Sequence, residues 1–92
     1  MKIKAEGDAI FGDLAKLHSQ GSPATSAQAM QVAERNRRHI EQWFYRCPRS
    51  MHAALGELYV ADSRFAANLE RYGAGLAEYA RDAWRANAAG QR

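Results

Sequence analysis

The segment between Trp43 and Phe65 concentrates the side chains that could do chemistry in this chain of 92 residues. It contains the only cysteine, Cys47, and places His52 five residues later, across Pro48. A thiol near an imidazole can act as a nucleophile. However, no glycine-rich phosphate loop, paired carboxylates or set of oxyanion donors accompanies this pair. The sequence therefore does not predict an enzyme.

Aromatic rings are also in excess here, beyond what a plain helical core would require. Rings provide a large contact area at low entropic cost and can stack on flat ligands. Each ring taken alone is more typical of a core, but their number favours the wall of a pocket for a large, weakly polar ligand. An exposed groove for a partner protein is the alternative, and exposure of Trp43 and Trp84 would distinguish it.

Length and composition indicate one globular domain. A chain of 92 residues supports one hydrophobic core, and 47% hydrophobic with 25% charged residues is typical of folded proteins. The sequence contains neither an apolar run long enough to span a membrane nor a signal-peptide pattern, so we expect a cytoplasmic protein. One cysteine and three histidines are too few for a convincing metal site, and no cofactor is expected.

The charge is mildly basic, at +3. The densest basic cluster is Arg35, Arg37 and Arg38, and Glu34 and Glu41 flank it. This pattern is typical of a solvated helix face with local ion pairs rather than of a nucleic-acid interface. We therefore do not expect this chain to bind DNA itself.

Helical periodicity runs through the whole chain and predicts an all-α fold, a compact bundle of about five helices. The expected helices span residues 5–19, 26–46 and 48–61, a fourth helix capped by Asp62, and residues 74–88. Thr25 and Gln28 have the spacing of a capping box for the second helix. Pro48 predicts a sharp bend before the third.

Apolar spacings of three and four predict which face each helix buries. In the second helix this face is expected to carry Met30, Ala33, the stem of Arg37, Ile40, Phe44 and Cys47. In the third helix it carries Met51, Leu55, Leu58 and Tyr59. In the fifth it carries Leu76, Tyr79, Ala80, Ala83, Trp84 and Asn87.

A long motif extends through the chain: Ala33-Glu34, Arg37, His39-Ile40, Trp43-Phe44-Tyr45, Cys47, Met51-His52, Leu55, Glu57, Tyr59-Val60-Ala61-Asp62, Arg64-Phe65, Gly75-Leu76-Ala77, Tyr79 and Ala86-Asn87-Ala88. In this motif the chain resembles the TipAS domains. These are the effector-binding carboxy-terminal domains of MerR-family transcription regulators that sense thiopeptide antibiotics and other compounds. The resemblance covers roughly residues 5–89 and is strongest over 33–62.

The resemblance implies a globin-like fold whose first helices can be mobile until a ligand closes them over a pocket. It also implies that a winged-helix DNA-binding domain and a dimerising coiled coil precede the module. Neither lies in residues 1–92, which we expect to be a single effector-binding domain. The chain would be either a domain of a longer protein or a standalone version of the module. In the first case the full-length protein would be a homodimer that contacts DNA only through its missing amino-terminal part.

Three departures from the family pattern bear on the chemistry. Thiopeptide-sensing members attack a dehydroalanine of the antibiotic with a cysteine seven residues after the position of Cys47, where this chain has Ala54. Cys47 matches a different family cysteine and is expected to pack as a small apolar residue. Asn36 replaces a common histidine and keeps hydrogen-bonding capacity, while Ser63 replaces a frequent proline. Capture of a ligand is therefore expected to be noncovalent.

The predicted ligand-binding residues are Asn36, His39, Trp43, Phe44, Tyr45, Met51, His52, Leu55, Tyr59 and Tyr79. The two histidines could bond a ligand, but a bond to a neighbouring carboxylate or carbonyl fits the sequence equally well. Gly7 and Gly12 weaken the first helix. We therefore expect a hydrophobic effector to enter beside this helix and to order it.

Overall fold

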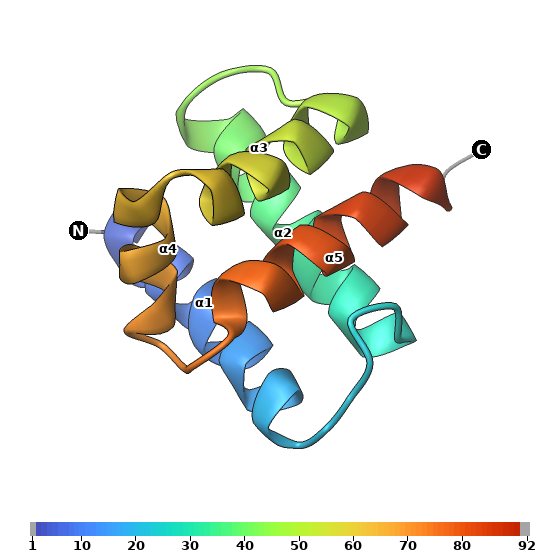
Figure 1. Cartoon of the computed structure of the whole chain (residues 1–92). Coiled ribbons are helices and arrows are strands. Elements are labelled where there is room, and N and C mark those ends of the chain that lie inside the picture. The colour runs from blue at the N-terminus through green and yellow to red at the C-terminus, as the bar shows by residue number, and fades with distance from the viewer. Residues whose placement is uncertain (1, 91–92) are drawn as a thin grey trace.

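The computed structural model describes residues 2–90, and within these residues it contains five helices and no strand (Figure 1). The helices are α1 (Lys2–Ser19), α2 (Ala27–Trp43), α3 (Arg49–Ala61), α4 (Ser63–Glu70) and α5 (Leu76–Ala89). Helix α5 crosses the middle of the molecule and packs against all four others. The predicted all-α bundle of five helices is confirmed.

The core is built around Trp84 of α5, whose side chain is fully buried. Rings from two other helices surround its indole. The His52 ring stacks on it at 4.6 Å between centroids, and Tyr59 meets it edge-on at 6.4 Å. Phe11 of α1 lies 6.3 Å away. The predicted buried face of α5 is confirmed, since all six of its residues are buried.

Helices α3 and α5 approach each other at Gly56. A Cβ atom added there would lie 3.0 Å from the Cα of Arg81 and 3.3 Å from the Trp84 side chain. Helix α3 therefore buries His52, Gly56 and Tyr59, which are spaced by four and three residues. The predicted face was wrong in part: Met51 and Leu58 are 44% and 42% exposed.

The buried face of α2 also differs from the prediction. Its buried residues are Ala29, Val32, Ala33, Asn36, His39 and Ile40. Because α2 packs against α1 on one side and α5 on another, it buries two neighbouring stripes, and one of these carries Asn36 and His39. Phe44, expected in the core, is 61% exposed.

Helix α2 ends at Trp43, three residues earlier than expected. The amides of Phe44 and Tyr45 both donate to the carbonyl of Ile40, and the backbone of Phe44 leaves the helical region at φ −125° and ψ −64°. The aromatic pair that follows therefore lies in a turn, where its rings can face solvent.

The caps of the helices are partly as predicted. Ser26, not Thr25, caps α2, and its hydroxyl accepts from the amide of Ala29. Asp62 accepts from the amide of Arg64 and also forms an ion pair with this residue, as expected. Helix α5 begins one residue after Gly75, whose φ of 84° favours glycine.

A candidate ligand groove beside helix α1

A groove of about 500 Å³ runs between α1 and the rest of the bundle. We call it the α1 groove. One wall is formed by α1 residues Ile3, Lys4, Gly7, Asp8 and Phe11. The opposite side consists of Asn36, His39, Ile40, Phe44, Tyr59 and Tyr72. A space of this size, lined mainly by rings and aliphatic groups with a few polar atoms, is typical of small-molecule sites.

The structure brings together only part of the predicted site. Asn36, His39, Phe44 and Tyr59 line the α1 groove. The other predicted residues, Trp43, Tyr45, Met51, His52, Leu55 and Tyr79, do not line it. The sequence predicted that the ligand enters beside the first helix, but no residue of α1 was named as a ligand contact, and Tyr72 was missed. Lys4, Asp8 and Phe11 share one helical face by their spacing, but two of them are charged, so this face gave no apolar signal.

Glu6 of α1, which does not itself line the groove, links two predicted site residues. Its Oε1 atom accepts from the indole N–H of Trp43 at 3.0 Å and lies 3.2 Å from Nδ1 of His39. The hydrogen bond from Trp43 is the main reason why the pKa of Glu6 is lowered. His39 is thus bonded to a neighbouring carboxylate, one of the two alternatives that the sequence left open.

Asn36 reaches the groove with His52 directly behind it. The Nε2 atom of His52 lies 2.7 Å from Oδ1 of Asn36, and the imidazole is buried against Trp84. Burial lowers the pKa of His52 to about 4. The ring is therefore neutral at pH 7 and orients the amide of Asn36 rather than facing a ligand.

A second carboxylate of α1 ties the helix to the turn after α4. Asp8 accepts a hydrogen bond from the hydroxyl of Tyr72 and forms an ion pair with Lys4 at 2.9 Å. The bond lowers the pKa of Asp8 and raises that of Tyr72. The charges on this wall are consequently paired, which suits a weakly polar ligand.

Helix α1 is anchored mainly through its second half. Its buried side chains are Ile10 and Leu14. The turns before Ile10 are attached through Glu6 and Asp8, whose carboxylates are exposed to solvent. Exposed hydrogen bonds of this kind contribute little net stability. The amino-terminal half of α1 is therefore the weakly held wall of the groove.

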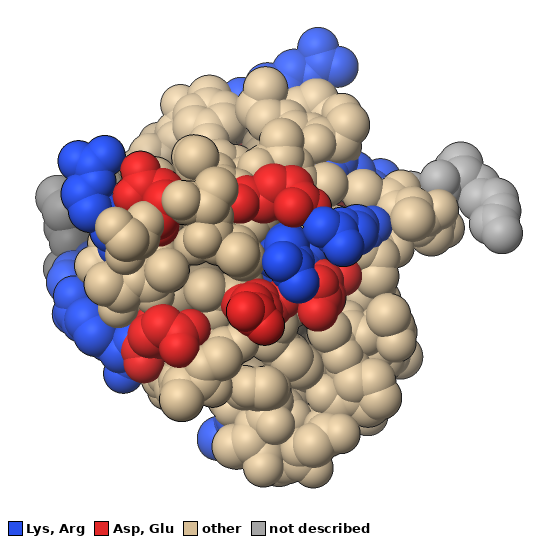
Figure 2. Space-filling model, viewed as in Figure 1, with Lys and Arg blue, Asp and Glu red and all other residues tan. Residues whose placement is uncertain are grey.

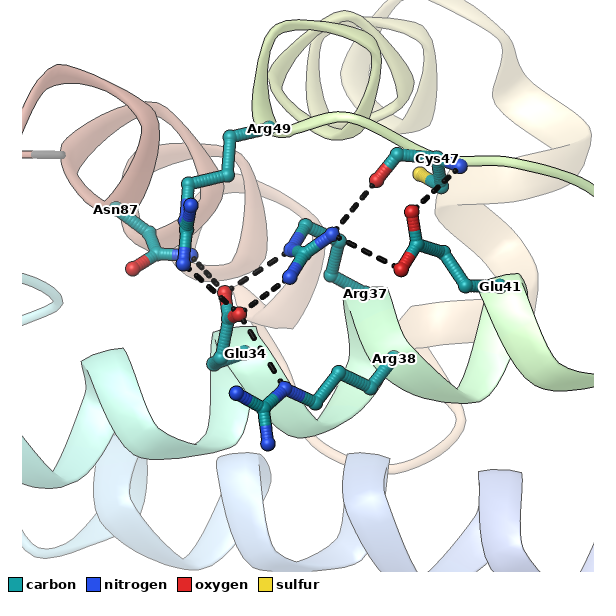
Figure 3. Close-up of polar contacts among 7 residues, drawn as sticks. All are labelled: Glu34, Arg37, Arg38, Glu41, Cys47, Arg49 and Asn87. Carbon is teal, nitrogen blue, oxygen red and sulfur yellow. Dashed lines mark hydrogen bonds and ion pairs between the residues drawn. The ribbon is translucent and has the colours of Figure 1, made fainter. Parts of the chain in front are cut away.

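Glu34 is the centre of a polar cluster that fixes the turn between α2 and α3 (Figure 3). Its carboxylate accepts from Arg37, Arg49 and Asn87, which come from α2, α3 and α5. The hydrogen bonds from Arg37 are the largest cause that lowers its pKa, to about 2. One carboxylate thus connects three helices.

Arg37 and Glu41 extend this cluster to the backbone of Cys47 (Figure 3). Arg37 donates to the carbonyl of Cys47 at 3.0 Å, and the amide of Cys47 donates to Glu41 at 3.2 Å. These contacts satisfy backbone groups that a continued helix would have paired. They hold the turn that carries Phe44 beside the groove.

The thiol of Cys47 is fully buried, as expected for a residue that packs. Burial raises its pKa, which disfavours the reactive thiolate. Its expected imidazole neighbour, His52, is bonded to Asn36. The two residues therefore lack the features of a nucleophile and its base.

Acidic and basic side chains are interspersed on the face of the molecule shown in Figure 2. The arginine cluster of α2 is paired, and the predicted local ion pairs are those of Arg37 and Arg38 with Glu34. Arg35 pairs instead with Asp13 of α1 at 2.8 Å, and Arg37 is largely buried rather than solvated. Among residues 2–90 no helix is long and apolar enough to cross a membrane. The same residues contain no group of three or more histidine, cysteine or acidic side chains placed to bind a metal ion.

Solved structures of related domains share this fold. A Streptomyces lividans TipAS structure described as a complex with nosiheptide has a TM-score of 0.90 at 42% identity, covering 96% of this chain and 62% of that one. The antibiotic-binding domain of a TipA-class multidrug resistance transcriptional regulator has a TM-score of 0.87 at 42% identity, covering 97% and 95%.

Curated relatives are transcriptional regulators. The HTH-type transcriptional activator TipA of Streptomyces coelicolor is 42% identical over 95% of this chain and 34% of its own length. The activator mta of Bacillus subtilis is 37% identical over 88% and 31%. The regulator SkgA of Caulobacter vibrioides is 36% identical over 98% and 36%. The chain thus spans about a third of the relatives that it matches.

The family model for the TipAS antibiotic-recognition domain matches residues 1–87. This match agrees with the motif in the sequence and with the fold. The chain belongs to the family of TipAS antibiotic-recognition domains.

Proposed function

We propose that this chain is the effector-binding domain of a MerR-class transcription regulator and that it binds multi-ring antibiotics, thiopeptides among them, in the α1 groove. The observation that carries the proposal is the groove itself, a ring-lined space of about 500 Å³ beside a weakly held helix. Its relative TipAS is described in complex with the thiopeptide nosiheptide. A flat ligand would stack on Phe44 and Tyr59 and exchange hydrogen bonds with Asn36 or His39.

Binding in this groove would be noncovalent. Cys47 is buried with a raised pKa, and Ala54 replaces the cysteine that the family resemblance assigns to covalent capture. The domain would have no enzymatic activity of its own, because nothing in the groove combines a nucleophile with a base.

Coupling to transcription would operate through α1. The helix can be docked on the bundle or undocked from it, and a ligand that contacts both α1 and the opposite wall favours the docked position. The fraction of docked molecules rises only as far as the ligand binds this position more tightly than the undocked one. In a longer cytoplasmic protein, this shift would bias a homodimeric DNA-binding part attached to the domain. DNA would be contacted by that part alone.

The test is a titration of the domain with nosiheptide, followed by amide NMR and by intact-mass spectrometry. We expect shifts at Ile10, Ile40 and Phe44 and no increase in protein mass. Phe44→Ala should weaken binding, whereas Leu58→Ala, which truncates an exposed apolar residue of α3 that does not line the groove, should leave it unchanged. A mass increase would refute noncovalent capture. The absence of any shift with nosiheptide and other multi-ring antibiotics would refute the proposed function.

A protein-interaction module is the second candidate, and the exposure of the α2–α3 turn favours it. Phe44 and Tyr45 of the turn are 61% and 47% exposed, and Met51 in the first turn of α3 is 44% exposed. The two tryptophans favour different alternatives. Trp43 is 36% exposed, which favours the interaction module, whereas Trp84 is fully buried, which does not. In this case a partner protein would protect the turn from hydrogen exchange while antibiotics would not.

A further inference from the structure

A second groove, of about 460 Å³, lies beside the carboxy-terminal half of α1. Gly12 and Ala15 form part of one wall, and Tyr72 and Gly73 of the turn between α4 and α5 form part of the other. We call it the glycine groove. Tyr72 also lines the α1 groove, so this one side chain borders both spaces.

The two grooves follow one face of α1. Asp8 and Phe11 line the α1 groove, and Ala15 and Ser19 line the glycine groove. Positions spaced by three or four residues lie above one another on a helix. The grooves therefore run end to end along α1, and Tyr72 lies where they meet.

Tyr72 is held at this junction by few contacts. Its hydroxyl donates to Asp8, and its ring lies 5.7 Å from the ring of Phe11. Tyr72 is 38% exposed, so its ring can move outward into solvent. Moving the ring outward would break one exposed hydrogen bond and would leave no buried polar group unpaired.

We propose that Tyr72 is a gate between two halves of one binding trough, and that it admits ligands too large for either groove alone. The proposal rests on the proposed function and deepens it, because it assigns the size selectivity of the site to one residue. A multi-ring antibiotic would place one part against Phe44 and Tyr59, displace the Tyr72 ring from Asp8, and extend over Gly12 and Ala15.

The test measures how fast nosiheptide associates with four variants: Tyr72→Phe, Asp8→Ala, the double variant, and Leu58→Ala as an exposed apolar residue that lines neither groove. Removing the hydrogen bond between Tyr72 and Asp8 raises the fraction of molecules in which the Tyr72 ring has moved away from Asp8 and the gate is open. We expect each of the two single variants to associate about fivefold faster than the wild type, the typical effect of one hydrogen bond. The double variant should be no faster than either, because both changes remove the same bond.

Amide NMR supplies the second measurement. Nosiheptide should shift the amides of Gly12, Ala15 and Gly73 in addition to those of the α1 groove. Shifts confined to the α1 groove would overturn the gate but leave the proposed function standing. Unchanged association rates in Tyr72→Phe, additive effects in the double variant, or an equal rate increase in Leu58→Ala would also overturn the gate. The absence of shifts in both grooves would refute the proposed function and the gate together.

Discussion

At the scale of single residues, the buried polar pair of Asn36 and His52 contains one residue that lines the groove and one that only holds the first in place. Both appeared equally suited to a ligand in sequence, because each can donate and accept. In the structure Asn36 lines the groove and His52 lies behind it. The difference arises from the tight approach at Gly56, which turns His52 toward α5.

His52 should make the domain sensitive to acid. Its pKa is about 4 in the fold against 6.5 in the unfolded chain, so protons favour the unfolded state. The stability that the neutral ring contributes to the fold is fully present above pH 6.5 and is lost as the pH falls toward 4. The expected loss in the free energy of unfolding is about 3 kcal/mol. Urea unfolding across this range should show a smaller loss for His52→Gln than for the wild type. Equal losses would contradict the prediction.

Glu34 should also stabilise the fold. It has more hydrogen-bond partners than His52, and its carboxylate stays charged down to a lower pH because its pKa is about 2. Glu34→Gln removes the carboxylate that Arg37 and Arg49 share and leaves Arg37 only its ion pair with Glu41 at 3.2 Å, and we expect a loss of about 2 kcal/mol in the free energy of unfolding at pH 7. The matched control is Glu57→Gln, which removes an exposed ion pair with Arg85 and should cost less than about 0.5 kcal/mol. Free energies of unfolding from urea titrations compare the two. Similar losses in both variants would argue against a central role of Glu34.

At the scale of helices, the buried face was predicted correctly for α5 and only in part for α2 and α3. Helix α5 contacts all four other helices, so its apolar pattern alone identifies its buried face. The face of α3 depends instead on where α5 approaches, and Gly56 decides this. A glycine inside a helix carries no hydrophobic signal, so the periodicity favoured Met51 and Leu58.

Gly56 and Gly12 should respond oppositely to substitution by alanine. Both lie within helices, where alanine is favoured over glycine by about 0.5–1 kcal/mol. At Gly12 a Cβ atom meets nothing within 4 Å, so Gly12→Ala should stabilise the protein. At Gly56 it meets the backbone of Arg81 at 3.0 Å, so Gly56→Ala should destabilise it by about 1–3 kcal/mol. Thermal unfolding would test both, and stabilisation by Gly56→Ala would contradict the close approach.

At the scale of the whole molecule, the family and fold could be predicted from sequence, but the groove could not. The long motif between Ala33 and Asp62 indicates the family, and helical periodicity indicates the bundle. The groove depends on how α1 lies across α2, and its first turns are too polar to reveal a buried face. Lys4 and Asp8 therefore appeared to be ordinary surface residues.

Hydrogen exchange should show unequal stability across the molecule. Amides of α1 before Ile10 should exchange faster than those near Ala80 and Trp84, because exposed polar contacts hold the former and the core holds the latter. Addition of nosiheptide should slow the exchange of the α1 amides. Equal protection of the two regions without ligand would contradict the weakly held wall.

The far end of α1 is fixed by a contact outside the groove. The hydroxyl of Tyr79 on α5 donates to the carbonyl of Ser22 at 2.7 Å, just beyond the last turn of α1. With the carboxy-terminal end fixed here and Ile10 and Leu14 buried in the core, an opening of the groove would be a bend near Ile10. The nine residues from Lys2 to Ile10 make a lever about 13 Å long. A swing of about 20° would displace the end at Lys2 by about 5 Å, so a ligand that fixes this half of α1 would also fix where the chain enters the domain.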